Sequence, residues 1–174
     1  DCQSIVKQAF ADTDINNKLT LTSANSINVA RWLPQQLYYL FAYQQWQQNE
    51  PPIVCVPSGN FGNICAGLLA NISGLPVQHF IAACNINDAV PQYLRTGNYQ
   101  SQIATPTISN AMDVGSPSNF VRILELFQNN YQQLKTTISG YTVSDANTMK
   151  TIRSVFQDYN YILDPHAAVA YYAM

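Results

Sequence analysis

Residues 51–74 read PPIVCVPSGNFGNICAGLLANISG, and the rest of the chain is organised around this stretch. The short, β-branched run Ile53–Val56 predicts a buried strand rather than a helix. Pro57–Asn60 break the run, and a helix is predicted over 61–73 because a Gly and a Pro follow it. A strand, a turn rich in Gly and Asn, and a helix in this order bring backbone N–H groups and a helix N-terminus to one point.

Such a point favours an anion, because the first N–H groups of a helix lack partners and the helix dipole attracts negative charge. Gly59 and Gly62 would let the backbone approach a ligand closely. The spacing Gly-Asn-Phe-Gly-Asn matches neither the dinucleotide fingerprint nor the P-loop. Taken alone, the loop leaves a phosphate site and an ordinary strand-to-helix turn as equal alternatives.

A second apolar run, Val77–Cys84, predicts a parallel neighbour of the first strand. We therefore expect an α/β fold with an open, mostly parallel twisted sheet and helices on both faces. Asn85, Asn87 and Asp88 follow the second strand at the sheet edge where ligands gather, although Asp88 also suits a helix N-cap. His79 lies inside the strand and is interpreted as structural.

The segment before residue 51 is predicted to hold a helix over 1–10, a strand marked by alternation over 19–23, and a helix over 27–48. Ser23, Asn25 or Ser26 would cap the last of these, and Pro34 would kink or break it. Arg31 lies near its start, where a cation opposes the dipole. It is either a solvated surface residue or a clamp for phosphate or carboxylate.

The segment after residue 97 begins with a long irregular stretch, 98–119, of the kind that often serves as a functional loop or lid. Apolar periodicity predicts a helix over 120–135, a second helix from Ser144 to Tyr159 and a last one opened by Asp164-Pro165. His166 at that start would either face a site or help to cap the helix.

Composition restricts the class of protein further. The chain has 174 residues, which suits one domain, and a net charge of −2 argues against a nucleic-acid surface. A charged fraction of only 10% leads us to expect a surface that packs against further protein or self-associates. We find no apolar run that could span a membrane. Cys2, Cys55, Cys65 and Cys84 form no C-x-x-C pair, so we expect reduced thiols in the cytoplasm and neither a disulfide framework nor a metal site.

Several motifs, in this order and at these separations, resemble the threonine synthase family along essentially the whole chain: TSANSINVAR (22–31), VPSGNFGN (56–63), TISNAMDV (107–114), PSN (117–119) and DPHAAVA (164–170). That family consists of pyridoxal-phosphate enzymes with a tryptophan-synthase-β-like fold. The resemblance implies that pyridoxal 5'-phosphate is the cofactor and that O-phospho-L-homoserine and water are converted into L-threonine and phosphate.

The resemblance also implies roles for single residues. The backbone of Ser58, Gly59, Asn60, Phe61, Gly62 and Asn63 would cradle the cofactor phosphate. Ser26 and Arg31 would bind the substrate phosphate, and Asn60 would reach it as well. Asp113, Asn119 and Asp164 fall in motifs near the cofactor pocket and receive no chemical role here.

The chain departs from the family pattern in two respects. The family's Schiff-base lysine stands in a Phe-Lys-Asp setting, which none of Lys7, Lys18, Lys135 and Lys150 has, and the segment that faces the pyridine nitrogen is also missing. We therefore expect a central fragment, residues 1–174, that is mostly the large domain, with an element of the small domain within residues 1–24. We expect no catalytic residue in it and no activity of the chain alone.

Two alternatives remain at this point. One is a related pyridoxal-phosphate lyase that acts on serine or threonine, against which Ser26 and Arg31 argue because those substrates carry no phosphate. The other is a non-catalytic α/β module that binds phosphate.

Overall fold

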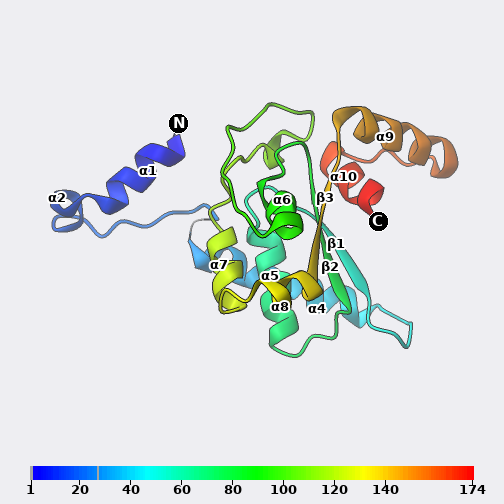
Figure 1. Cartoon of the computed structure of the whole chain (residues 1–174), viewed down its shortest axis with the longest axis horizontal. Helices are drawn as coiled ribbons and strands as arrows, with labels where there is room; N and C mark the ends of the chain where they lie inside the picture. The colour runs from blue at the N-terminus through cyan, green and yellow to red at the C-terminus, as the bar shows by residue number, and fades with distance from the viewer. Residues whose placement is uncertain (1, 27) are drawn as a thin grey trace.

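The computed structural model describes residues 2–26 and 28–174, with side chains described from residue 5 onward in the first helix. In chain order the elements are α1 (Cys2–Ala11), α2 (Thr13–Asn16), α3 (Val29–Trp32), the 3-10 helix η1 (Leu33–Gln35), α4 (Gln36–Gln44), β1 (Ile53–Pro57), α5 (Gly62–Ile72), β2 (His79–Cys84), α6 (Ala89–Thr96), the 3-10 helix η2 (Asn110–Met112), α7 (Phe120–Leu126), α8 (Tyr131–Thr137), β3 (Ile138–Thr142), α9 (Asp145–Tyr159) and α10 (Pro165–Ala173). Figure 1 shows α1 and α2 standing apart from the body of the molecule on an extended connection.

A parallel sheet in the order β1-β2-β3 forms the centre of the body. Ile53 pairs with His79 between β1 and β2, and Phe80 pairs with Ile138 between β2 and β3. The predicted strand, helix and parallel strand over 53–84 are confirmed. The third strand, Ile138–Thr142, was missed, because it follows α8 without a turn and its middle residue is a glycine.

Helices cover both faces of this sheet, as predicted (Figure 1). Side chains alternate along a strand, so Phe80, Ala82 and Cys84 enter a core built with α5, α7 and α8. Ala83 points to the opposite face and packs with Val169 of α10. The sheet is therefore buried from two sides, which is the usual condition for parallel strands.

The last two helices begin at the predicted caps. The Ser144 side chain accepts a hydrogen bond from the Asn147 N–H, and α9 follows. The Asp164 side chain accepts from the N–H groups of His166 and Ala167, and α10 follows with Pro165 in its first turn. His79 is structural, as predicted, because its ring lies within hydrogen-bond distance of the Thr136 carbonyl and the Ser139 hydroxyl, at 3.2 and 3.0 Å.

The predictions for the N-terminal segment need correction. Residues 19–23 form no strand, because no strand of the described residues lies beside them to accept their backbone hydrogen bonds, and Leu19 is 61% exposed. The predicted helix over 27–48 divides at Pro34 into α3, η1 and α4, so the expected break is confirmed. Its cap is Asn28, whose side chain accepts from the Ala30 N–H, and not one of the three residues proposed from sequence. Ile27 lies outside the described residues.

The predicted helix over 120–135 is two helices, α7 and α8. Gln128 and Asn129 both adopt left-handed backbone conformations, with φ of 52° and 56°, which no helix can continue through. Asn130 then caps α8 by accepting from the Gln133 N–H at 3.0 Å. Apolar periodicity misses this break, because the buried residues keep a helical spacing across it.

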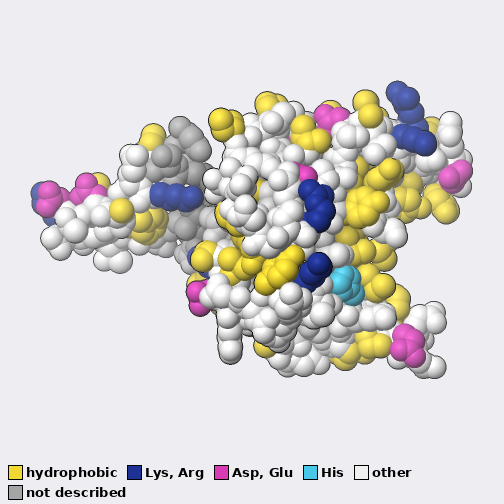
Figure 2. Space-filling model, viewed as in Figure 1, with side chains coloured by type: hydrophobic (Ala, Val, Ile, Leu, Met, Phe, Trp, Pro, Cys, Tyr) yellow, Lys and Arg dark blue, Asp and Glu magenta, His cyan; other side chains and the backbone are white. Residues whose placement is uncertain are grey.

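Charged side chains are sparse on the face that Figure 2 shows, and apolar side chains are visible between them. Large exposed apolar residues include Ile103 at 95%, Tyr38 at 76% and Ile162 at 72%. None of the helices within residues 2–26 and 28–174 has the length and apolar character needed to cross a membrane.

The break between α7 and α8 predicts that one substitution has opposite effects at two sites. Gln128→Gly should raise the free energy of unfolding by about 0.5 kcal/mol, because glycine adopts the left-handed conformation of this position without the steric cost that a Cβ brings. Gln157→Gly, at an exposed position inside α9, should lower it by about 1 kcal/mol. Urea denaturation of both variants measures the two values. Destabilisation of similar size at both positions would mean that residue 128 lies inside a helix.

Candidate functional site

The turn between β1 and α5 begins at a residue fixed by the sheet. Ser58 is 1% exposed, its N–H donates to the Ala83 carbonyl at 2.8 Å, and its hydroxyl donates to the Val56 carbonyl at 3.0 Å. The backbone N–H of Ser58 therefore continues the strand pairing and is not available to a ligand. Any anion at this turn would be bound by the N–H groups that follow.

The next N–H groups, those of residues 59–63, donate no hydrogen bond to any acceptor in the described part of the chain. Gly62 and Asn63 open α5, where the first N–H groups have no carbonyl four residues earlier in the helix. Unpaired backbone donors at the start of an 11-residue helix are the elements of an anion site. The structure thus provides the donors that the sequence predicted, with Ser58 excepted.

Phe61 adopts a left-handed conformation, with φ of 64° and ψ of 12°, directly before the helix. This conformation is unusual for a bulky residue. The ring is 2% exposed and packs edge-to-face on Phe120, with ring centroids 6.2 Å apart, so core packing holds the backbone in place. A left-handed residue next to helical ones turns successive N–H groups into an anion-binding concavity. Sequence analysis missed this role, because it assigned the backbone freedom to glycines.

Gly59 and Gly62 are needed because other segments pack directly against their Cα atoms, and neither has a positive φ. A Cβ on Gly59 would lie 2.7 Å from the Met112 Cα, which no real Cβ tolerates, so η2 rests directly against the turn. A Cβ on Gly62 would lie 3.3 Å from the Asn119 Nδ2 and 3.4 Å from the Ser26 Cβ. The two glycines therefore let segments distant in sequence reach the turn.

Asn60 joins three of these segments. Its Oδ1 accepts from the Ser118 N–H at 2.7 Å and from the Ser118 hydroxyl at 2.9 Å. The Ser118 N–H can only donate, which fixes the orientation of the Asn60 amide and places its Nδ2 2.6 Å from the Ser26 Oγ. The Asn119 Nδ2 donates to the Asn60 carbonyl at 3.0 Å, and Asn119 in turn accepts from Arg122.

Ser26 is consequently held as an acceptor of the Asn60 Nδ2, and its own hydroxyl hydrogen remains free to donate. The structure thus brings Ser26 and Asn60, two of the residues that the resemblance assigns to the substrate phosphate, together beside Gly62. The Asn60 Oδ1 is engaged by Ser118, but its Nδ2 carries a second N–H beyond the one donated to Ser26. Asn60 can therefore hold the turn and Ser26 and still donate one hydrogen bond to a ligand.

Arg31 is exposed and lies in the last turn of α3, a helix of four residues. The dipole argument for Arg31 carries no weight, because α3 is a single turn that continues directly into η1, and Arg31 lies near both of its ends. The described residues contain no carboxylate ion-paired with Arg31. Its neighbour Trp32 is 4% exposed, and its Cβ would lie 3.6 Å from a Cβ on Gly62.

The Trp32 indole N–H is buried without an acceptor in the described part of the chain. A buried donor without a partner costs stability, and this one is also closed off from solvent, so it offers no hydrogen bond to a ligand at the turn. The donors that fit a phosphorylated molecule are the unpaired N–H groups of residues 59–63.

His166 lies in the first turn of α10, and its side chain contacts η2. The Ala111 N–H donates to its Nε2 at 3.2 Å, so the ring proton lies on Nδ1, which faces Asp164 Oδ1 at 3.0 Å. Burial acts to raise the pKa of Asp164, but hydrogen bonds from the His166 side chain and from two backbone N–H groups hold it below its usual value. His166 therefore connects the last helix to the segment that rests on Gly59.

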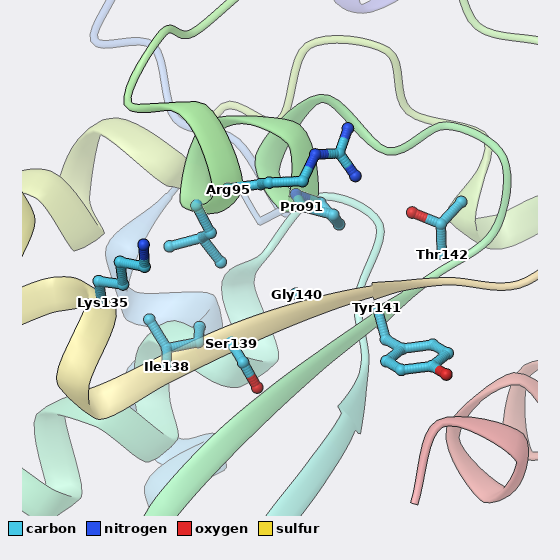
Figure 3. Close-up of a pocket in the computed structure, with 9 residues that line it drawn as sticks. Pro91, Arg95, Lys135, Ile138, Ser139, Gly140, Tyr141 and Thr142 are labelled. Carbon is cyan, nitrogen blue, oxygen red and sulfur yellow. The ribbon is translucent and has the colours of Figure 1, made fainter.

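The side chains of Cys55, Cys65 and Lys135 make no hydrogen bond to residues 59–63 in the described part of the chain. Burial raises the pKa of Cys55 and of Cys65 to about 11, which leaves both thiols neutral. Lys135 lines another groove of about 480 Å³ beside β3, with Arg95 on its other side (Figure 3). Within the described part of the chain, no group of three or more His, Cys, Asp or Glu residues could hold a metal ion.

Comparison with known proteins gives consistent matches. The model of the family described as pyridoxal-phosphate dependent enzyme matches residues 1–174. Threonine synthase of Serratia marcescens is 47% identical over 99% of this chain. The crystal structure of threonine synthase from Escherichia coli superposes with a TM-score of 0.91 at 47% identity, over 99% of this chain. A pyridoxal-phosphate-bound threonine synthase from Brucella melitensis gives a TM-score of 0.85 at 31% identity, again over 99% of this chain.

The chain spans only part of these relatives. It covers 40% of the Serratia and Escherichia proteins and 42% of the Brucella protein. The match therefore describes the elements around the β1–α5 turn and not the whole of the relatives.

The bracing role of Asn60 predicts a specific loss of stability. Asn60→Ala removes three side-chain hydrogen bonds and should lower the free energy of unfolding by about 2 kcal/mol. Asn98→Ala, at an exposed position with no recorded side-chain hydrogen bond, should change it by less than about 0.5 kcal/mol. Chemical denaturation compares the two. Equal small effects would show that the Asn60 amide does not hold the segments together.

Proposed function

The chain belongs to the family of pyridoxal-phosphate dependent enzymes, and we propose that it forms part of a threonine synthase that converts O-phospho-L-homoserine and water into L-threonine and phosphate. The observation that carries the proposal is the row of unpaired N–H groups at residues 59–63, in a chain 47% identical to threonine synthase of Serratia marcescens. A phosphorylated cofactor and a phosphorylated substrate both require such donors.

The N–H groups of Gly59, Asn60, Phe61, Gly62 and Asn63 would hold the cofactor phosphate. Ser58 would contribute by anchoring the turn to β2, since its N–H is bonded to Ala83. When bound, pyridoxal phosphate supplies an electron sink that stabilises a carbanion. Backbone amides hold a dianion without a counter-charge, so this chain can position the cofactor although the turn has no lysine.

The second phosphate group, that of the substrate, would be bound by Ser26 and Arg31. The Ser26 Oγ accepts a hydrogen bond from the Asn60 Nδ2, so the hydrogen of the Ser26 hydroxyl is free to be donated to a phosphate. The Arg31 guanidinium is exposed and would supply the charge that compensates a phosphate at this position. Asn60 would assist by fixing the Ser26 hydroxyl beside the turn.

The covalent attachment of the cofactor and the proton transfer require a lysine in this family. None of Lys7, Lys18, Lys135 and Lys150 follows a Phe and precedes an Asp. We therefore propose that residues 1–174 contribute binding and orientation, mostly as large domain with an element of the small domain within residues 1–24. We expect the isolated chain to turn over no substrate.

Two features of the chain bear on its compartment and on its contacts with other protein. Cys55, Cys65 and Cys84 are free thiols, which supports a reducing compartment such as the cytoplasm. Exposed apolar residues such as Ile103 and Tyr38 support packing against further protein or self-association of the isolated chain.

The proposed activity is tested with the full-length protein and its cofactor. Phosphate should be released from O-phospho-L-homoserine in step with formation of L-threonine, and removal of pyridoxal phosphate should abolish both. Chromatography of the amino acid and a phosphate assay measure the two products. Deamination of L-serine or L-threonine without turnover of the phosphorylated substrate would support the lyase alternative instead.

The role of Arg31 is tested by comparison with another exposed arginine. Arg31→Ala should raise the KM for O-phospho-L-homoserine by about 10- to 100-fold, because it removes a charge-assisted hydrogen bond to phosphate. Arg153→Ala, on the exposed side of α9, should leave KM within about twofold. Steady-state kinetics of both variants decide between them. Unchanged KM for Arg31→Ala would make this residue a solvated surface arginine.

A further inference from the structure

The segment that rests on the β1–α5 turn is held by a polar network beside the carboxyl end of β2. Asn85 and Asn87, directly after that strand, are 1% and 6% exposed. The Asn87 side chain donates to the Thr105 carbonyl at 2.9 Å and accepts from the Thr105 N–H at 2.7 Å. One side of the long loop is thereby fixed to the sheet.

Asp113 gathers the other side of the loop. Its Oδ1 accepts from the Asn85 Nδ2 at 2.9 Å, from the Asn87 Nδ2 at 3.2 Å and from the Thr107 hydroxyl at 2.7 Å. Its Oδ2 accepts from the Thr107 N–H at 2.9 Å. The carboxylate therefore closes residues 107–113 into a ring and ties that ring to β2.

The closed segment contains η2, which presses on the turn. Met112 is 4% exposed in the core with Val169, and its Cα would lie 2.7 Å from a Cβ on Gly59. The Ala111 carbonyl would lie 3.1 Å from the same Cβ. A displacement of η2 would therefore remove the support behind the first of the unpaired N–H groups.

From these contacts we infer that Asp113 is a positioning residue, whose carboxylate fixes η2 against Gly59 and so keeps the N–H groups of residues 59–63 aimed at a phosphate. This inference deepens the proposed function and rests on it. Asp113 makes no hydrogen bond to residues 59–63 in the described part of the chain, so it acts on the turn through η2. This role requires a side chain that only accepts hydrogen bonds, because each partner of the Asp113 carboxylate donates one to it.

Asp113→Asn is the sharp test, because an amide has the same shape but places an NH₂ group against at least one of these donors. The experiment compares full-length protein freed of cofactor for its dissociation constants toward pyridoxal phosphate and toward pyridoxal, which lacks the phosphate. The Asp113→Asn variant should bind pyridoxal phosphate about 10-fold more weakly, with binding of pyridoxal changed by less than about twofold. Fluorescence titration measures both constants.

Two further variants keep the test independent of folding. Thr107→Val removes the hydroxyl that donates to Asp113 and should lower the preference for the phosphorylated form, whereas Thr107→Ser retains the hydroxyl and should preserve it. Asp145→Asn is the matched control, because the Asp145 carboxylate accepts from the Ile108 N–H of the same loop without touching the network. Its preference for pyridoxal phosphate should equal that of the wild type.

The outcomes separate the inference from the proposed function. Equal losses for both ligands in Asp113→Asn and Thr107→Val, or no loss in either variant, would overturn the positioning role while the wild type still prefers pyridoxal phosphate. A wild-type protein that binds pyridoxal phosphate no better than pyridoxal would contradict the proposed function and the inference with it.

Discussion

A row of backbone donors must stay unpaired and yet be held rigidly, and the rest of the structure depends on this constraint. An N–H group without an acceptor is tolerated only where water or a ligand can reach it, and a mobile turn would close on itself. The chain meets the constraint by ending β1 with the bond from Ser58 to Ala83 and by packing the Phe61 ring into the core. Between these two anchors the backbone cannot turn its N–H groups inward.

The side chains that brace the turn are largely amides, which explains why so polar a region carries so few charges. Asn60, Asn85, Asn87 and Asn119 each donate and accept at once, so they join segments through neutral groups. Carboxylates at the same positions would repel a phosphate, and lysines or arginines would have to be desolvated. The low charged fraction of 10% is therefore in part a property of the candidate site.

The sequence predicts those parts of the fold that depend on local signals. The β1–α5–β2 unit, α9 and α10 each begin or end at a Gly/Asn turn, a Ser or an Asp, and each lies where that signal places it. Ile138–Thr142, the left-handed pair at Gln128 and Asn129, and the left-handed Phe61 depend on packing between distant segments, which periodicity does not contain. For the site, the motifs indicated Ser26 and Asn60, which the structure joins, but they could not indicate that Asp113 closes a network of loop and sheet residues. The role of Arg31 stays a prediction, because no hydrogen bond or ion pair within the described residues fixes the direction of its exposed side chain.

The groove beside β3 has a consequence for solubility. In the sheet of the described residues β3 is an outer strand. The Val143 N–H donates to the Cys84 carbonyl of β2, and backbone groups point to alternate sides along a strand. The N–H and C=O groups of Gly140 and Thr142 therefore point away from β2. An open strand of this kind is a template on which another chain can add and start a fibril. Arg95 and Lys135 flank it (Figure 3), and two such outer strands could meet only by bringing like charges together. Electrostatic repulsion between copies thus opposes aggregation at the β3 edge of the sheet.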